Sequence, residues 1–353
     1  MRRIALAALA LGLAFPAAAP AKGLEIGLQD DPNEASGLAS IAPFAYRYQY
    51  LSGDIRGQSG WRNWNPNGSF VKNYVRESKR AGITPVFSYY TIQQSEPGLG
   101  RPEPEAVREN LGNRAFVKAW LADIELALKR IGGNRAILQV EPDMWGYIQQ
   151  RHRRRAPRNV RRIARRIVRI RNRVAPKVQL AYPLSIWGSG PDVVYNDTPL
   201  EQIPKLARRS ARFYRSLGAR FDLVFGEMDD RDSGFNEVVG GDGGKSWWTE
   251  ADYERHVRFF ANFTKAARRK VMIWQVPLGN STLDNSDKHW RDDKVETLLG
   301  DPDRRWLKRY ADAGVVAFLF GAGIEGCTTD ETDGGVFHRL AAAYYDEGLV
   351  PLP

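Results

Sequence analysis

Short apolar runs recur along the chain, and segments with helical periodicity separate most of them. The runs are nearly continuous in apolar residues, which is typical of strands that are buried on both faces of a parallel sheet. Eight of them predict strands, at Leu24–Gln29, Phe44–Tyr50, Ile83–Ile92, Ala136–Val140, Val178–Pro183, Phe221–Phe225, Val271–Val276 and Val315–Phe320.

The segments between these runs carry apolar residues at helical spacing. They predict helices at Phe70–Ala81, Pro104–Ile131, Asn159–Val174, Leu200–Leu217, Thr249–Arg269, Arg304–Ala313 and Val336–Glu347. The connection Asn33–Ala42 is long enough for only one or two turns. Glycines follow several of the helices as expected of C-terminal caps, at Gly82, Gly132, Gly218 and Gly314. Thr249 is expected to cap its helix, with acidic residues in the first turn.

Eight strand–helix units predict an α/β fold, a single (β/α)8 TIM-type barrel over residues 22–353. The main competitor is a doubly wound open sheet, but no G-x-G-x-x-G follows the first strand. The chain contains neither a sequence repeat nor a low-complexity linker, so we expect one domain. The long loops at 229–248 and 278–303 are expected to wall a cleft.

Residues 1–21 predict a secretory signal peptide. Arg2 and Arg3 precede the apolar core Ile4–Phe15, and Ala19–Ala21 has the small-residue pattern of a cleavage site. This core is shorter than the roughly 18–20 residues that a membrane span needs. We therefore expect cleavage near Ala21 and export, with the protein secreted or held in the periplasm or cell envelope. Cys327 is the only cysteine, so no intramolecular disulfide is expected.

The positive charge of the chain is concentrated in residues 151–173, which hold twelve arginines and no acidic residue. Removing these twelve charges from the net charge of +11 leaves −1. Apolar residues recur at helical spacing within the segment, at Val160, Ile163, Ala164, Ile167, Ile170 and Val174. This pattern predicts an amphipathic helix that packs on the core, with arginines over its outer face.

Two interpretations of the Arg151–Arg173 helix stay open. Its arginines form a solvated surface, which is the usual role of a charge run, or they bind an anionic cell-envelope polymer, a membrane surface or nucleic acid. The segment has no aromatic residue on which bases would stack. We therefore expect no nucleic-acid partner, and we expect a monomer.

Acidic, amide and aromatic side chains collect where the predicted strands end. In a barrel these ends form one rim, and active sites are built there. The fourth strand runs into Glu141, Asp143 and Trp145, and the sixth into Glu227 and Asp229. Other strand ends offer Asp30, Asp31, Tyr89, Tyr90, Trp187, Trp274, Gln275 and Asn280. Carboxylates and amides suit sugar hydroxyls, and aromatic rings stack on the apolar faces of sugars, so the mixture predicts a carbohydrate site.

Glycosidic hydrolysis needs two carboxyl groups of opposite protonation that flank the bond. Glu141 and Glu227 follow the fourth and sixth strands, whose axes lie roughly 9 Å apart, so both the retaining and the inverting separation stay open. We predict Glu141 as the general acid, with its pKa raised by Trp145 and Asp143. Glu227 is then the nucleophile or base, and Asp229 modulates it.

The remaining candidates are assigned to substrate binding. Tyr90, Trp187 and Trp274 would form stacking platforms, while Gln275 and Asn280 would bind hydroxyls. The tryptophans at 145, 187 and 274 also have a simpler interpretation as caps of the barrel core, and the loop 229–232 could be a salt-bridged turn.

A carboxylate metal site is the main alternative among enzymes, since Asp30, Asp31, Glu141 and Asp143 could bind Ca²⁺ or Mg²⁺ through oxygen. No D-x-D-x-D-G loop supports such a site, and the four histidines lack metal-site spacing. We therefore expect neither a metal nor a cofactor. The rival from another class is a non-catalytic carbohydrate-binding or envelope-associated barrel.

The pattern of the whole chain resembles the secreted (β/α)8 glycoside hydrolases. The segment ILQVEPDMWGYI is also similar to the I-E-P-D-S-L segment of the family 6 cellulases, with Glu141 and Asp143 at the motif's glutamate and aspartate. The general-acid aspartate of that family follows the preceding strand, where this chain reads SYYTIQQSE with Glu96 as its only acid. A large retaining clan places its nucleophile at the end of the seventh strand, where this chain has Gln275. The resemblance implies a secreted enzyme that hydrolyses glycosidic bonds in a poly- or oligosaccharide.

Overall fold

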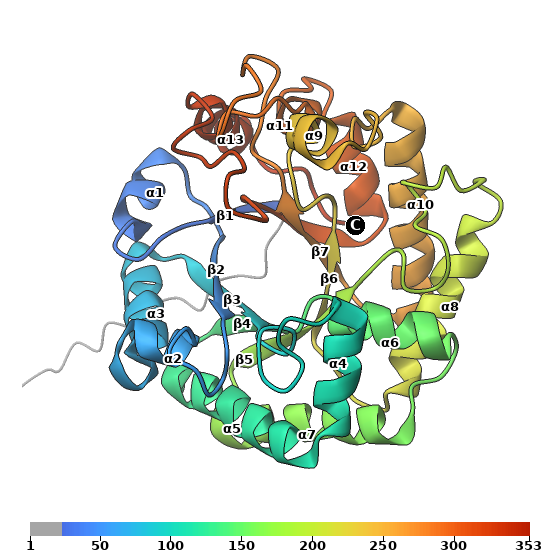
Figure 1. The fold of residues 1–353 in the computed structure, drawn as a ribbon. Helices are drawn as coiled ribbons and strands as arrows, with labels where there is room; N and C mark the ends of the chain where they lie inside the picture. The colour runs from blue at the N-terminus through green and yellow to red at the C-terminus, as the bar shows by residue number, and fades with distance from the viewer. Residues whose placement is uncertain (1–22) are drawn as a thin grey trace, which may run out of the picture.

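The computed structural model describes residues 23–353, so the predicted signal peptide lies outside the described residues. Within them, eight strands in consecutive order form a closed barrel in which every neighbouring pair is parallel. Figure 1 looks along this barrel, with the strands at the centre and the helices around them. The predicted (β/α)8 fold is confirmed. No helix of the described part is both long enough and apolar enough to cross a membrane.

The strands agree with the predicted runs to within about two residues at most ends. They are β1 Glu25–Gln29, β2 Tyr46–Ser52, β3 Thr84–Tyr90, β4 Ala136–Val140, β5 Val178–Leu184, β6 Leu223–Glu227, β7 Val271–Val276 and β8 Val315–Phe320. All residues of β4 are buried, as expected of a parallel strand that is covered on both faces.

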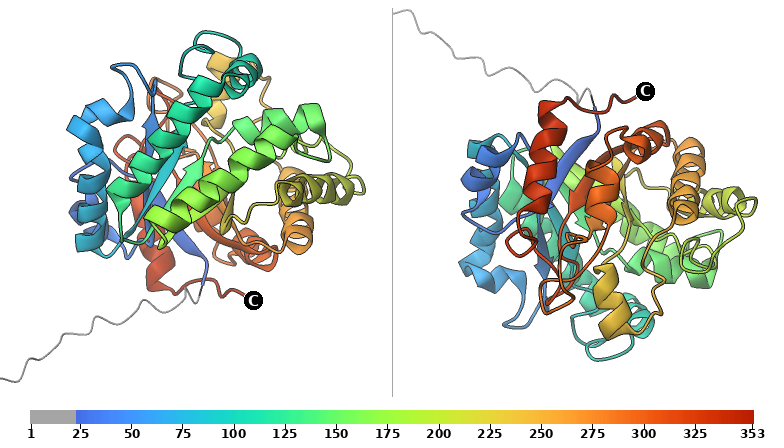
Figure 2. Two further views of the ribbon diagram at one scale, coloured as in Figure 1. Left: turned by 90° about the horizontal axis from the view of Figure 1, so that it is seen from below. Right: turned by 90° about the horizontal axis from the view of Figure 1, so that it is seen from above.

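The helices form the outer ring of the barrel, and the two views of Figure 2 show them on its sides. They are α1 Ala35–Ile41, α2 Trp61–Trp64, α3 Ser69–Ala81, α4 Glu103–Gly112, α5 Arg114–Ile131, α6 Met144–His152, α7 Arg158–Val174, α8 Ile203–Ser216, α9 Ser233–Phe235, α10 Glu250–Ala267, α11 Lys294–Leu299, α12 Arg305–Asp312 and α13 Val336–Asp346. Short helical turns occur at Pro66–Gly68 and Asn236–Gly240.

The helices differ from the prediction in two ways: one predicted helix is divided, and α2, α6, α9 and α11 were not predicted. The segment expected to form one helix from Pro104 to Ile131 forms α4 and α5, because the Asn113 side chain accepts a hydrogen bond from the main-chain N–H of Phe116 and caps a new helix. Helix α6 was not predicted, and it begins directly after Asp143. The predicted cap of α10 is confirmed, and Thr249 forms a capping box in which the Asp252 carboxylate accepts from both the N–H and the hydroxyl of Thr249.

The core has two layers. A large layer lies between the strands and the helices, and it includes the apolar face of α7. A smaller cluster fills the barrel interior, made of Tyr48, Val86, Ile137, Ala181, Phe225, Met272, Trp274, Ala317 and Leu319. Because Trp274 also lines the cleft at the carboxyl end of the strands, the top of this interior cluster forms part of the cleft floor.

Candidate active site

A cleft of about 1060 Å³ opens at the carboxyl ends of the strands. Residues at the ends of β2 to β8 line it, whereas β1 contributes none. Two loops were expected to wall a cleft. The loop at 229–248 contributes residues 229–231 to its lining, whereas the loop at 278–303 contributes none. The rim predicted from the strand ends therefore forms a cleft.

Glu227 is the last residue of β6 and its side chain enters the cleft. The period of two along a strand places it on the same face as Phe225, which belongs to the barrel interior. The indole N–H of Trp187 donates a hydrogen bond of 2.9 Å to the Glu227 carboxylate. Burial, followed by the charges of nearby aspartates including Asp143, raises the pKa of Glu227 well above its usual value. Both causes favour the protonated form of this carboxyl group.

Asp143 lies in the turn between β4 and α6, and it also lines the cleft. Burial raises its pKa to about 7, and the negative charges of Glu103 and Asp230 contribute to the shift. A hydrogen bond with the Tyr90 hydroxyl opposes the shift. Asp143 and Glu227 therefore bring two carboxyl groups to one cleft from strands β4 and β6.

Glu141, in contrast, does not line the cleft and is fully buried. Side chains alternate along β4 between the barrel interior, where Ile137 lies, and the helices, and this alternation would have pointed Glu141 to the interior. The φ of 57° at Glu141 interrupts the alternation. The carboxylate accepts hydrogen bonds of 2.8–3.2 Å from the N–H and hydroxyl of Thr91, the N–H of Ile92 and the indole N–H of Trp120. The structure thus separates Glu141 from Glu227, and the acid that β4 brings to the cleft is Asp143.

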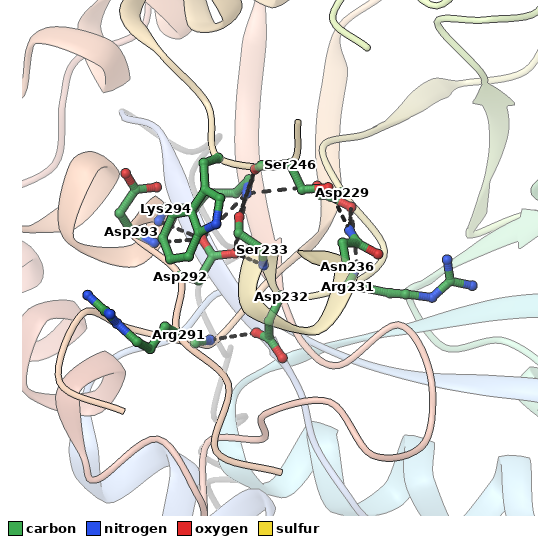
Figure 3. A network of polar contacts seen from close by, with 12 residues as sticks. Asp229, Arg231, Asp232, Ser233, Asn236, Ser246, Arg291, Asp292, Asp293 and Lys294 are labelled. Carbon is green, nitrogen blue, oxygen red and sulfur yellow. Dashed lines mark hydrogen bonds and ion pairs between the residues drawn. The ribbon is translucent and has the colours of Figure 1, made fainter. Parts of the chain in front are cut away.

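Asp229 lines the cleft in front of a buried polar network, which Figure 3 shows from close by. Its carboxylate accepts a hydrogen bond of 3.3 Å from the Asn236 amide and lies 3.8 Å from the ammonium group of Lys294. Lys294 is itself fully buried, and it donates to Ser233 and lies 3.3 Å from Asp292. Burial raises the pKa of Asp229 to about 7, while Lys294 opposes the shift. Lys294 thus places a buried positive charge beside Asp229, while its hydrogen bonds go to other acceptors.

Aromatic side chains line the same cleft. Tyr90, Trp187 and Trp274 are found there as predicted sites, and the structure adds Tyr50, Trp64, Tyr147 and Tyr195. The Trp187 ring stands 5.0 Å from the ring of Tyr147. A Cβ at Gly146 would lie 2.4 Å from the Trp187 ring, so this glycine leaves the room that the indole occupies. Gln275 also lines the cleft and donates to the Tyr50 hydroxyl.

Several candidates belong to the packing of the barrel instead. The Tyr89 hydroxyl donates to Asp123, the Trp145 indole to the carbonyl of Val140, and the Asn280 amide to the carbonyl of Asp333, and all three side chains are buried. For Trp145 the simpler interpretation as a cap of the core agrees with its contacts to Tyr182 and Phe221.

Asp30 and Asp31 lie at a separate cavity of about 400 Å³, where Asp30 forms an ion pair with Arg47. The four acids considered as a metal site are therefore distributed over three places, namely this cavity, the packing around Glu141 and the main cleft at Asp143. Within residues 23–353, no cluster of three or more His, Cys, Asp and Glu side chains is arranged to bind a metal ion.

Comparison with known proteins supports the fold. No protein-family model matches the chain, and no curated protein is similar to it in sequence. Among solved structures, a xyloglucan-specific β-1,4-glucanase of glycoside hydrolase family 5 from a ruminal metagenomic library is 13% identical with a TM-score of 0.50, over 91% of this chain and 88% of that one. A modular family 26 endo-β-1,4-mannanase from Cellulomonas fimi is 11% identical with a TM-score of 0.56, over 93% of this chain and 72% of that one.

The chain shares the (β/α)8 fold of these two glycoside hydrolases. The resemblance of the whole chain is thus confirmed at the level of the fold. The local likeness of the Glu141–Asp143 segment to family 6 is not confirmed by these comparisons.

Sequence reasoning missed two acids that line this cleft. Glu103 begins α4 and Asp192 lies in the loop after β5, and both line the cleft. The Glu103 carboxylate accepts a hydrogen bond from the Tyr147 hydroxyl, on the side of the cleft that also holds Asp143. Neither acid directly follows a strand, so a search of strand ends does not find them.

The buried carboxyl groups predict how stability depends on pH. Burial raises the pKa to about 7 for Glu141, Asp143, Asp229 and Asp232, whereas in an unfolded chain such groups titrate near pH 4. The folded protein therefore binds more protons between about pH 4 and 7, so its stability falls as the pH rises through this window. His256, whose pKa burial lowers to about 4, acts in the opposite direction but is a single group. We expect a higher Tm at pH 5 than at pH 8 by calorimetry, and an equal or lower Tm at pH 5 would contradict these shifts.

Proposed function

We propose that the protein is an exported glycoside hydrolase that cleaves glycosidic bonds in a poly- or oligosaccharide. The observation that carries the proposal is the pair Asp143 and Glu227. Both carboxyl groups line one aromatic cleft, and the charge of Asp143 contributes to the raised pKa of Glu227. Hydrolysis of a glycosidic bond requires such a pair, with one member protonated and the other ionised.

The charges around the two carboxyl groups assign the roles. The negative charge of Asp143 is among the causes that raise the pKa of Glu227, whereas the charges that raise the pKa of Asp143 are those of Glu103 and Asp230, so we assign Asp143 as the ionised member of the pair. Glu227 is then the general acid, and its proton passes to the glycosidic oxygen as the bond to the anomeric carbon breaks. Asp143 either accepts a proton from the water that attacks the anomeric carbon or attacks that carbon itself, and water then releases the sugar. Gln275 at the end of β7 offers no carboxylate for a mechanism that uses β4 and β7.

The charge of the cleft favours an uncharged or amino sugar over a uronic acid. Its lining includes seven acidic residues, Glu103, Asp143, Asp192, Glu227, Asp229, Asp230 and Glu325, and Arg231 is the only lysine or arginine among the lining residues. A carboxylated sugar would add negative charge to this surface, which costs Coulomb energy in a partly desolvated site. The aromatic side chains supply flat apolar surfaces for sugar rings.

The assignment predicts a bell-shaped dependence of kcat/KM on pH. Activity should rise with pH through about 7 as Asp143 ionises, and it should fall at higher pH as Glu227 loses its proton. Steady-state rates across pH 5 to 10 on a neutral polysaccharide measure both limbs. Trp187→Phe removes a hydrogen bond that lowers the pKa of Glu227, so the alkaline limb should move to higher pH while the acid limb stays in place. A profile that falls steadily from pH 5 upward would contradict the roles.

The decisive experiment is a hydrolysis screen on neutral and amino polysaccharides, with NMR analysis of the anomer released first. Hydrolysis of one of these polymers supports the proposal, and the anomer distinguishes retention from inversion. Binding of a polymer without turnover across the whole panel would favour the non-catalytic carbohydrate-binding barrel.

A further inference from the structure

One side of the barrel carries arginines that the proposed hydrolysis does not use. They are exposed on the end of α6, on α7 and on α8, and we call this surface the basic face; it comprises Arg151, Arg153, Arg154, Arg155, Arg158, Arg162, Arg165, Arg166, Arg169, Arg173, Lys205, Arg208, Arg212 and Arg215. The left view of Figure 2 shows α7, drawn in yellow-green, along the outside of the barrel. The predicted amphipathic helix is thus present, with Val160, Ile163 and Ile167 buried beneath it.

The helices of the basic face are joined to one another. The Gln149 amide of α6 donates to the Ser210 hydroxyl of α8, and the main-chain N–H of Ala156 donates to the hydroxyl of Ser216. Burial lowers the pKa of Arg209 on α8, and the positive charges of Arg154, Arg153 and Arg212 add to this shift. The arginines of the turn after α6 and those of α8 therefore share one surface.

This positive charge has few partners within the described residues. In the 151–173 segment only Arg171 and Arg173 form ion pairs, with Asp222 and Glu125. The sequence has no acidic residue between Asp143 and Asp192, or between Glu201 and Asp222. Elsewhere on the barrel, arginines meet acids, as where Arg305 and Arg309 pair with acids of α10.

A solvated surface alone does not require this arrangement. The buried apolar residues of α7 supply its packing, and mixed charges would solvate its outer face equally well. Like charges within one Debye length repel each other, which destabilises the folded state unless an external anion offsets the repulsion. The concentration of arginine therefore points to an anionic partner.

The chemistry of the basic face selects among anionic partners. The exposed large apolar residues, Trp64, Leu99, Tyr195, Leu200, Val238 and Val239, all lie outside its segments, so it offers no apolar group to insert into a lipid interface. Residues 151–173 contain no Phe, Tyr or Trp on which bases would stack. What the face offers is the planar guanidinium group, which binds carboxylates through two parallel hydrogen bonds. The arginines of α7 extend over about 25 Å, the length of this helix at about 1.5 Å per residue.

We propose that the basic face binds a linear anionic polysaccharide of the cell envelope, in extended contact along α7. The polymer acts as an anchor and is not the substrate, because the acidic residues of the cleft would repel an anionic polymer. Tyr147 and Gln150 of α6 line the cleft, and Arg151 follows them directly, so a bound polymer would hold the cleft close to the envelope.

The test compares two variants that lose the same charge. The α7 variant carries Arg158→Gln, Arg162→Gln, Arg165→Gln and Arg169→Gln, four exposed positions along one stripe. The control carries Lys72→Gln, Arg76→Gln, Lys79→Gln and Arg80→Gln, four exposed positions on α3. Glutamine keeps a high helix propensity, and circular dichroism verifies the fold of both proteins. Binding of polygalacturonate is measured by isothermal titration calorimetry, with dextran as the uncharged polymer and with duplex DNA and phosphatidylglycerol vesicles as competing anions.

We expect polygalacturonate binding that weakens as salt is added, and a loss of affinity on the order of tenfold in the α7 variant but not in the α3 control. Equal loss in both variants would mean a general charge effect and would overturn the proposal. Tighter binding of the wild type to DNA or to vesicles than to polygalacturonate would also overturn it. Because binding is measured directly, its outcome does not depend on whether the protein hydrolyses a glycan.

Discussion

Replacing Glu227 by glutamine is expected to lower kcat on the natural polymer by about three orders of magnitude, since the amide cannot protonate the leaving oxygen. The fold should be retained, because the side chain is only partly buried and the amide preserves its volume and can still accept the Trp187 hydrogen bond. The measurement is the initial rate on the polysaccharide found in the screen, with circular dichroism on the same sample.

A substrate with a good leaving group distinguishes the loss of an acid from a general loss of the site. An aryl glycoside whose phenolate leaves without protonation should keep far more activity in Glu227→Gln than the polymer does. The matched control is Glu201→Gln, the same chemical change at an exposed residue outside the cleft lining, which should retain wild-type rates. Wild-type turnover of the polymer by Glu227→Gln would remove Glu227 from the mechanism.

The barrel itself could be predicted because parallel strands covered on both faces must be apolar throughout. Ala136–Val140 shows this most clearly, since every one of its residues is buried and its predicted bounds are the observed ones. A helix boundary that was predicted wrongly depends on a single side chain. Asn113 divides one predicted helix into α4 and α5 through one hydrogen bond, and the periodicity of apolar residues contains no signal of it.

The site could be predicted in part for a related reason. Glu227 lies inside a strand, so the period of two carries its side chain from Phe225 to the cleft. Glu141 lies one residue beyond β4, where a left-handed φ of 57° overrides that period. Such a conformation is unfavourable for a residue with a Cβ, and strand periodicity does not predict it. The sequence thus indicated the correct strand end, while the acid that reaches the cleft is the next one along, Asp143.

The cleft residues outside the strand ends could not be predicted in this way. Glu103, Asp192 and Tyr195 come from loops or helix starts, and their positions depend on how α4 and the loop after β5 fold back over the rim. Their effect is electrostatic as well as steric, because the charge of Asp192 contributes to the raised pKa of Glu227. The strand ends therefore indicate the proposed pair, Asp143 and Glu227, more readily than the groups that shift its pKa values.

Glu141→Ala is expected to lower the free energy of unfolding by about 3–5 kcal/mol, because it leaves the donors of a buried site without an acceptor. The affected donors belong to Thr91, Ile92 and Trp120, and all of them surround a side chain with no exposed surface. Urea denaturation followed by tryptophan fluorescence measures the loss, with the Glu201→Ala variant as the exposed control. The same experiment with Glu141→Gln measures the contribution of these hydrogen bonds, since the amide offers the donors one carbonyl oxygen where the carboxylate offers two.

The activity of the folded fraction then separates the two glutamates. If Glu141 supports the loop after β3 and Glu227 performs the proton transfer, Glu141→Ala below its unfolding temperature should retain most of its kcat per folded molecule. Glu227→Gln should retain its stability and lose its kcat. The reverse outcome, a stable Glu141→Ala protein without activity, would return the general-acid role to Glu141. It would also require the β4 turn to change conformation when substrate binds, because the carboxylate observed here already has all its hydrogen bonds directed away from the cleft.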